Sequence, residues 1–373
     1  MVYFDNAATT PVPKAVADAM YEVLTAHFGN PSSQYPIGVE MKKAVEGWRA
    51  VIAGALGCPA ERLYFTSCGT ESDNWAIQAA LWQNRHRGRH IITTAVEHSA
   101  VLEPCKLLAQ QGYEVTYLKP GQDGNVTAEQ VADALREDTA LVSVMLVNNE
   151  TGCVFPAADI AALLREKGSP ALLHCDAVQG FLKLPFTVKS LGADMVTISG
   201  HKIHAPKGIG ALYIRSGLHL RPLIVGGSQE DGRRAGTEAM PNICAFGEAA
   251  RIGRELMAES TARMAALRER TVERLRAENP GLLVIGGGAP HILCISLPGY
   301  RSEVLMNYLE ARGISVSKSS ACKKGGRSHV LEAMGVDAAW IDGSVRVSLS
   351  DETTEEISGD LPEILRRLSG VAE

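Results

Sequence analysis

Several features that define special classes of protein are missing from this sequence. No apolar run reaches the roughly 18 residues that a bilayer-spanning helix needs. The N-terminal stretch MVYFDNAATTP has neither the basic region nor the apolar region of a signal peptide. The sequence therefore predicts a cytoplasmic protein with no membrane among its partners.

Cysteine pairs and excess positive charge are missing as well. The 8 cysteines are spread out with no C-x-x-C pair, which is neither a zinc pattern nor a disulfide framework. The net charge is -5 and no basic stripe is present, which argues against a nucleic-acid partner. His201 and His204 lack a third ligand near them in sequence, so we expect no metal site. The 373 residues of ordinary globular composition are enough for two domains.

Apolar runs alternate with helical patterns along most of the chain. The run 140–147 is apolar almost throughout, as in a strand buried on both faces, and the runs 171–176 and 195–198 follow the same scheme. Helical periodicity is clearest over 38–56 and 243–277. This β-α-β-α order, with polar residues after successive strands, predicts an α/β fold with a mostly parallel sheet.

One polar loop follows the apolar run 195–198 and contains Lys202. Open α/β sheets bind their ligands at the carboxyl ends of strands, which is where this lysine is expected to lie. Ser199 and His201 stand on either side of Gly200 just before it. A lysine in this setting suits a Schiff base to an aldehyde cofactor whose phosphate the neighbouring residues bind.

A second candidate anion site lies where a glycine turn leads into a helix near Thr70. Unpaired N–H groups at a helix start bind anions readily. Thr70 and Asp73 could instead form an ordinary capping pair, and the residues alone leave both interpretations open.

Eleven segments, taken in order from residue 3 to residue 350, resemble the cysteine desulfurases of the class V aminotransferase group. They are YFDNAATTP, FGNPSS, FTSCGTESDN, EHSAVLEPC, VNNETG, HCDAVQG, SGHKIHAPKGIGALYIR, RRAGTE, SSACK, SHVLEAMG and VRVSLS. The resemblance implies the fold of type I enzymes that use pyridoxal 5'-phosphate (PLP). A large domain, 15–255, would contain a mostly parallel seven-stranded sheet flanked by helices. A smaller α+β domain, 1–14 with 256–373, would carry a catalytic cysteine loop.

The same resemblance implies the residues that hold PLP. Lys202 would form the Schiff base and act as the base, Asp176 would keep the pyridine nitrogen protonated, and His98 would stack on the ring and shuttle a proton. The remaining implied cofactor contacts are Gly69, Thr70, Asn149, Gln179, Ser199, His201 and Thr237. Thr237 would come from the second subunit of a homodimer, and Gln179 would bind the phenolic oxygen.

Substrate binding and sulfur chemistry are expected from the C-terminal part. Arg346 suits a bidentate grip on a substrate carboxylate, which Asn149 would share. Cys322 lies among small polar residues, and Lys323 and Lys324 beside it should favour the reactive thiolate.

The expected reaction converts L-cysteine to L-alanine and leaves a persulfide on Cys322. Its sulfur would pass to an acceptor or iron–sulfur scaffold protein, for iron–sulfur cluster, thio-cofactor or tRNA biosynthesis. A selenocysteine lyase, another class V PLP lyase or aminotransferase, and a non-enzymatic interaction module are the alternatives.

The chain differs from the family pattern at two places. Cys68 replaces a small residue before the Gly-Thr pair, and the loop between Cys322 and Ser328 is about two residues shorter than in the longer-loop group. The shorter reach leaves delivery of the persulfide to a partner open.

Overall fold

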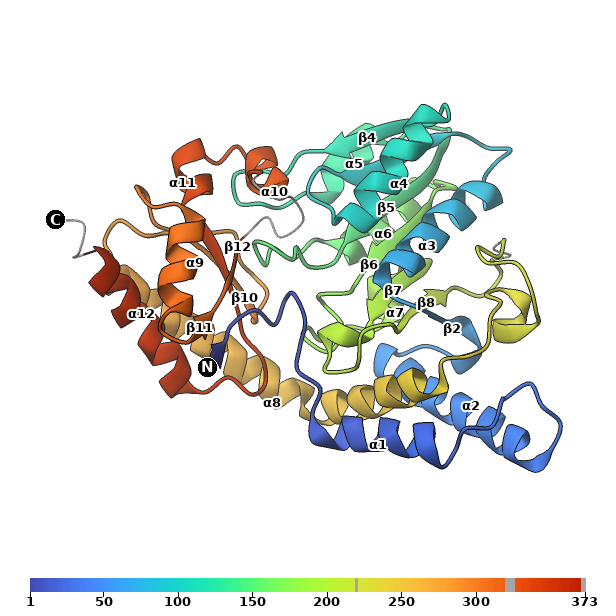
Figure 1. Cartoon of the computed structure of the whole chain (residues 1–373). Coiled ribbons are helices and arrows are strands. Elements are labelled where there is room, and N and C mark those ends of the chain that lie inside the picture. The colour runs from blue at the N-terminus through green and yellow to red at the C-terminus, as the bar shows by residue number, and fades with distance from the viewer. Residues whose placement is uncertain (219–220, 319–325, 370–373) are drawn as a thin grey trace.

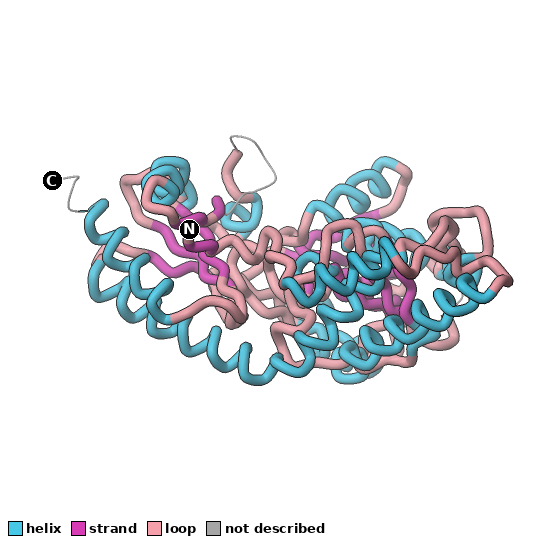
Figure 2. The backbone as a smooth tube through the Cα atoms, turned by 60° about the horizontal axis from the view of Figure 1, so that its bottom comes forward, coloured by secondary structure: helices cyan, strands magenta, loops and turns pink. Residues whose placement is uncertain are grey.

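The computed structural model describes residues 1–218, 221–318 and 326–369. Two groups of strands form two lobes (Figure 1), and Figure 2 shows the same two groups from another side. The large lobe contains a seven-stranded sheet, and the small lobe contains a four-stranded and a two-stranded sheet. The expected α/β architecture is thus confirmed.

The large sheet is mostly parallel. Its strands, in sheet order, are β2 (Leu63–Thr66), β8 (Gly210–Ile214), β7 (Met195–Ser199), β6 (Leu172–Asp176), β5 (Thr139–Met145), β3 (His90–Thr94) and β4 (Glu114–Leu118). Only β8 runs antiparallel to its neighbours, β2 and β7, while β7, β6, β5, β3 and β4 are parallel.

Helices bury both faces of this sheet, which explains the continuous apolar character of its strands. The helices of the large lobe are α1 (Lys14–Thr25), α2 (Pro36–Leu56), α3 (Gly69–Gln83), α4 (Ser99–Gln110), α5 (Ala128–Ala134), α6 (Ala157–Glu166) and α7 (Val188–Leu191). On β5, Leu141 packs in the core under α3 and α4, whereas Val142 and Val144 belong to the core on the opposite face.

The small lobe is built on an antiparallel sheet. Its order is β12 (Ser317–Lys318), β13 (Ser344–Ser348), β10 (Ile292–Ser296) and β9 (Leu283–Ile285). The N-terminal β1 (Val2–Tyr3) pairs in parallel with β11 (Ile314–Ser315). The helices here are α9 (Ser302–Glu310), α10 (His329–Ala333), α11 (Ala338–Asp342) and α12 (Glu355–Ser369).

Two segments connect the lobes. Helix α8 (Met240–Glu278) runs from beneath the large lobe to the small lobe (Figure 1). The N-terminal segment leaves β1 in the small lobe and reaches α1 in the large lobe. The domain limits 15–255 and 1–14 with 256–373 stay a prediction, and α8 continues through residue 255 without a break.

Within the described ranges, no helix combines the length and the apolar character needed to cross a membrane. In the same ranges, no group of three or more His, Cys, Asp or Glu side chains is placed to hold a metal ion.

Candidate active site

A cavity of about 330 Å³ opens between the lobes, at the carboxyl ends of β5, β6 and β7. The residues that line it are Ala7, Ala8, Cys68, Gly69, Thr70, Asp73, His98, Ala100, Met145, Val147, Asn149, Asp176, Val178, Gln179, Ser199, His201, Lys202 and Arg346. Because parallel strands end at the same edge of a sheet, polar residues that follow different strands meet here. Of the described residues that the sequence suggested for the site, all except Thr237 line this cavity.

Lys202 ends a short 3-10 helix, Gly200–Lys202, that directly follows β7. Its Nζ donates hydrogen bonds to the carbonyl oxygens of Ala7 at 2.6 Å and Ala8 at 2.7 Å. The N-terminal segment therefore holds the amine at the cavity wall. Sequence reasoning did not find these two backbone acceptors.

Asp176 ends β6, and its Oδ1 accepts the N–H of Val178 at 2.9 Å. Burial raises the pKa of Asp176, although the Val178 N–H, His98 and Lys202 act in the opposite direction. Gln179 Nε2 donates to the carbonyl of Ala7 at 2.8 Å. A second buried acid, Asp73, lines the same cavity, and burial together with the charge of Asp176 raises its pKa well above its usual range.

His98 is the N-cap of α4, and its Nδ1 accepts the backbone N–H of Ala100 at 3.2 Å. Burial lowers the pKa of this imidazole, and nearby Lys202 adds to that effect while Asp176 opposes it. With Nδ1 engaged as an acceptor, the neutral ring carries its proton on Nε2. That tautomer can donate one hydrogen bond into the cavity.

The start of α3 and the end of β7 form one end of the cavity. Helix α3 begins at Gly69 with Cys68 as N-cap, and no side chain caps it. Asp73 is 1 % exposed on the buried side of the helix, so the interpretation of Thr70 and Asp73 as a capping pair is wrong. The free N–H groups of the first turn thus remain available to an anion.

Two further groups stand at this end of the cavity. Among the described residues, the buried Ser199 Oγ has no hydrogen-bond partner. Burial, reinforced by Lys202 and Lys207, lowers the pKa of His201 to about 4. A neutral imidazole and a free hydroxyl can both donate hydrogen bonds to an anion.

Arg346 lies in β13 of the small lobe and is 2 % exposed. Its Nη1 donates to the carbonyl oxygen of Asn149 and its Nη2 to Asp5 Oδ1, both at 2.7 Å. Within the described part of the chain its Nε has no partner. Asp5, which sequence reasoning missed, thus occupies part of the guanidinium fork that was predicted for a substrate.

One predicted residue lies away from the cavity, and another falls outside the part of the chain that the structure describes. Thr237 is exposed on the segment between β8 and α8 and does not line the cavity of its own chain. Cys322 lies outside the described residues. Cys68, the departure from the family pattern, lines the cavity beside Gly69.

Comparison with known proteins identifies the family. The model of the class-V aminotransferases matches residues 2–358. The chain belongs to this family. The family implies PLP as cofactor, and its match confirms the family recognised from the sequence motifs.

Named relatives align with nearly the whole chain. A cysteine desulfurase of Nostoc sp. is 44% identical over 383 residues, covering 100% of this chain and 94% of its own. A NifS-like protein of known structure is 38% identical with a TM-score of 0.93, and covers 99% of both chains. The structure of SspA in complex with cysteine is 33% identical with a TM-score of 0.82, and covers 95% of this chain and 100% of its own. These relatives confirm the fold and the cysteine desulfurase assignment.

Proposed function

We propose that this protein is a cytoplasmic, homodimeric PLP enzyme that converts L-cysteine to L-alanine and places the sulfur on Cys322. The persulfide would then supply a sulfur acceptor or iron–sulfur scaffold protein. One observation carries the proposal: Lys202, Asp176 and His98 from the large lobe and Arg346 from the small lobe line one cavity.

The cavity fits PLP at its phosphate end. Ser199 Oγ, which has no partner in the described ranges, offers a donor to an anion, as do the start of α3 and the imidazole of His201. Gly69 lets the start of α3 pack closely against the segment after β6, because a Cβ at this position would lie only 3.0 Å from Val178 Cγ2. Asp176 would pair with the protonated ring nitrogen and Gln179 with the phenolic oxygen.

Each of the polar residues proposed for the site then has a defined task. When bound, PLP withdraws electrons from the α-carbon of the substrate. Lys202 takes the α-proton at its Nζ, since an amine beside the reacting carbon is the base within reach. Arg346 and Asn149 hold the substrate carboxylate. His98 donates a hydrogen bond from Nε2 into the cavity. Arg346 is buried, which limits the access of water on its side of the cavity.

The sulfur step uses Cys322. Its thiolate attacks the substrate sulfur, so an S–S bond forms while the bond between the substrate's β-carbon and its sulfur breaks. A proton is added at the β-carbon, which gives alanine and a persulfide on Cys322. No external oxidant or reductant is needed, because one thiol and cysteine become one persulfide and alanine.

The homodimer is supported by the position of Thr237 and by exposed apolar side chains. Thr237 is exposed and outside its own cavity, as expected of a residue that serves the partner's phosphate site. Tyr21, Phe28 and Val225 are 67%, 69% and 81% exposed. A second chain that covered these side chains would remove their apolar surface from water.

Mass spectrometry of the protein after incubation with sulfur-labelled cysteine tests the proposal. We expect one added sulfur on the peptide that contains Cys322, and none in Cys322→Ser, which should still bind cofactor and substrate. Normal desulfuration by Cys322→Ser would instead indicate another class V lyase or an aminotransferase. Preferential turnover of selenocysteine would indicate a selenocysteine lyase.

A further inference from the structure

The segment that carries Thr237, residues 224–239, has an unusual backbone. We call it the Thr237 loop. Within it Glu230 and Asp231 have φ values of 50° and 55°, a left-handed conformation that non-glycine residues rarely adopt. Such strain persists only where surrounding contacts hold it.

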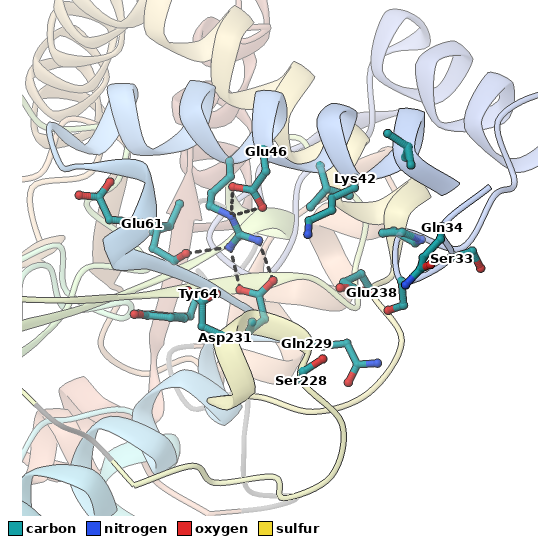
Figure 3. A pocket seen from close by; sticks show the side chains of 17 residues that line it. Ser33, Gln34, Lys42, Glu46, Glu61, Tyr64, Ser228, Gln229, Asp231 and Glu238 are labelled. Atoms are coloured by element: carbon teal, nitrogen blue, oxygen red, sulfur yellow. Dashed lines mark hydrogen bonds and ion pairs between the residues drawn. The ribbon is translucent and has the colours of Figure 1, made fainter. Parts of the chain in front are cut away.

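A buried ion pair supplies those contacts (Figure 3). Arg49 of α2 donates from Nη1 to Glu230 Oε2 at 2.7 Å and from Nη2 to Glu230 Oε1 at 2.8 Å. The Arg49 side chain is 9% exposed and that of Glu230 is 3% exposed. The pair lines a separate cavity of about 700 Å³ between α2 and the Thr237 loop.

Glu230 also reaches the edge of the large sheet. Its Oε2 accepts the backbone N–H of Phe65 in β2 at 2.8 Å. Arg49 donates to the carbonyl of Leu63 at 2.8 Å, and its guanidinium carbon lies 4.6 Å from the centre of the Phe65 ring. The two oxygens of Glu230 thus meet three N–H donors, which fixes the carboxylate to both α2 and β2.

Further contacts hold the Thr237 loop between Glu230 and Gly236, the residue before Thr237. Gln229 Oε1 accepts the N–H of Gly236 at 3.2 Å, which closes the loop on itself. Arg234 pairs with Glu71 in the first turn of α3, with Nε 2.9 Å from Oε1. The loop is therefore held at Glu230, Arg234 and Gly236, and Thr237 follows directly.

We propose that Glu230 is a positioning residue whose effect appears in the partner's active site, because it shapes the loop that presents Thr237 to the partner's PLP phosphate. This rests on the proposed homodimer with Thr237 crossing the interface. A buried ion pair is by itself weak evidence of a stabilising role, whereas a role in fixing one conformation accounts for the strained residues beside it.

Glu230→Gln tests the proposal, since it keeps the shape of the side chain but turns an NH2 group toward N–H donors. In the homodimer we expect PLP to be bound about tenfold more weakly or worse, as for the loss of one hydrogen bond to a charged group. The readout is the amount of PLP fixed by borohydride on the Lys202 chain as the PLP concentration is raised.

Hybrid dimers show on which chain the defect acts. Glu230→Gln is co-produced with Lys202→Ala, each with its own affinity tag, and the hybrid is isolated. Its only Lys202 belongs to the Glu230→Gln chain, whose cavity receives Thr237 from a partner with an intact loop. We expect wild-type PLP affinity at that lysine, which also shows that the Glu230→Gln chain is folded.

Two comparisons complete the experiment. Glu46→Gln, an exposed partner of Arg49 outside the loop, should leave PLP affinity unchanged. The Thr237→Ala homodimer should bind PLP weakly, and its hybrid with Lys202→Ala should bind PLP with wild-type affinity. If the hybrid also binds PLP weakly, Thr237 does not cross to the partner's site. If Thr237→Ala is rescued but Glu230→Gln is not, or if the Glu230→Gln homodimer binds PLP normally, only the role of Glu230 is overturned.

Discussion

A permanent positive charge that is almost fully buried needs acceptors, and Arg346 has two before any substrate arrives. Its Nη2 is 2.7 Å from Asp5 Oδ1, in an ion pair whose Asp5 side chain is 21% exposed. The substrate carboxylate that we propose to bind here would therefore meet both an oriented guanidinium and a negative charge beside it. Asp5 orients Arg346 through the hydrogen bond and weakens its attraction for carboxylates through the charge.

Two substitutions separate these effects of Asp5. Asp5→Asn keeps an oxygen acceptor but removes the charge, so we expect KM for cysteine to fall about threefold, as for a partly exposed ion pair worth less than 1 kcal/mol. Asp5→Ala removes the acceptor as well and should raise KM, because the guanidinium loses its orientation. Steady-state kinetics measures both, and equal shifts in the same direction would contradict this division.

The sequence predicted which charged side chains line the cavity better than it predicted their supports. Asp176 ends the apolar strand β6 and Lys202 ends the short helix after β7, so their place at the sheet edge could be inferred. Asp5 gave no such signal, because its partner is 341 positions away in the chain. For Thr70 and Asp73 the sequence left a capping pair and an anion site both open, since spacing alone does not tell on which side of a helix turn a carboxylate is buried.

At the scale of elements, helix α10 is tied to the segment that follows β5. Its N-cap Ser328, which also accepts the N–H of Leu331 at 3.1 Å, donates from Oγ to Glu150 Oε2. His329 Nε2 lies 3.1 Å from the carbonyl oxygen of Glu97. The start of α10 in the small lobe is thereby fixed to the large lobe beside Asn149.

The carboxyl group of Glu150 should make this tie sensitive to pH. Burial raises its pKa to about 7, although Ser328 and Arg346 act to lower it. Between about pH 4.5 and pH 7 the folded protein keeps a proton that the unfolded chain releases, so the contribution of this group to stability falls as the pH rises.

Glu150→Gln imitates the protonated carboxyl group at every pH. We expect it to match the wild type in thermal stability at pH 5 and to exceed it at pH 8, by about 1–3 kcal/mol for a buried group with this pKa. Melting curves from pH 5 to pH 8 measure the difference. Glu332→Gln, at an exposed position of α10, is the control, and parallel curves for Glu150→Gln and wild type would refute the prediction.

Long periodic elements were also the easiest to predict from the sequence. The pattern over 38–56 corresponds to α2 (Pro36–Leu56), and that over 243–277 to α8 (Met240–Glu278). Short strands such as β9 (Leu283–Ile285) and β12 (Ser317–Lys318) were not predicted. Two or three residues contain too few side chains to display a period, and only pairing with a neighbouring strand defines them.

At the scale of the molecule, the two lobes share buried contacts around the N-terminal segment. The N–H of Ala7 donates to Ser348 Oγ at 2.9 Å, and Asn6 Nδ2 donates to the carbonyl of Ser348 at 3.0 Å. His204 Nε2 in the large lobe is 2.9 Å from Asp351 Oδ1, which follows β13. Together with the unbroken α8, these contacts indicate that the lobes unfold as one cooperative unit.

Phe4→Ala tests this cooperativity, because Phe4 is 0% exposed in the core of the small lobe. Loss of a buried phenylalanine costs about 3–5 kcal/mol. If the lobes are one unit, the free energy of opening falls equally for amides of β10 (Ile292–Ser296) and of β5 (Thr139–Met145) in the large lobe, as measured by native-state hydrogen exchange. Val142→Ala, in the core of the large lobe, should likewise lower the free energy of opening for the amides of both strands. A loss of protection in β10 alone after Phe4→Ala would mean that the small lobe opens by itself, and that the contacts around residues 4–8 align the active site without coupling the stability of the two lobes.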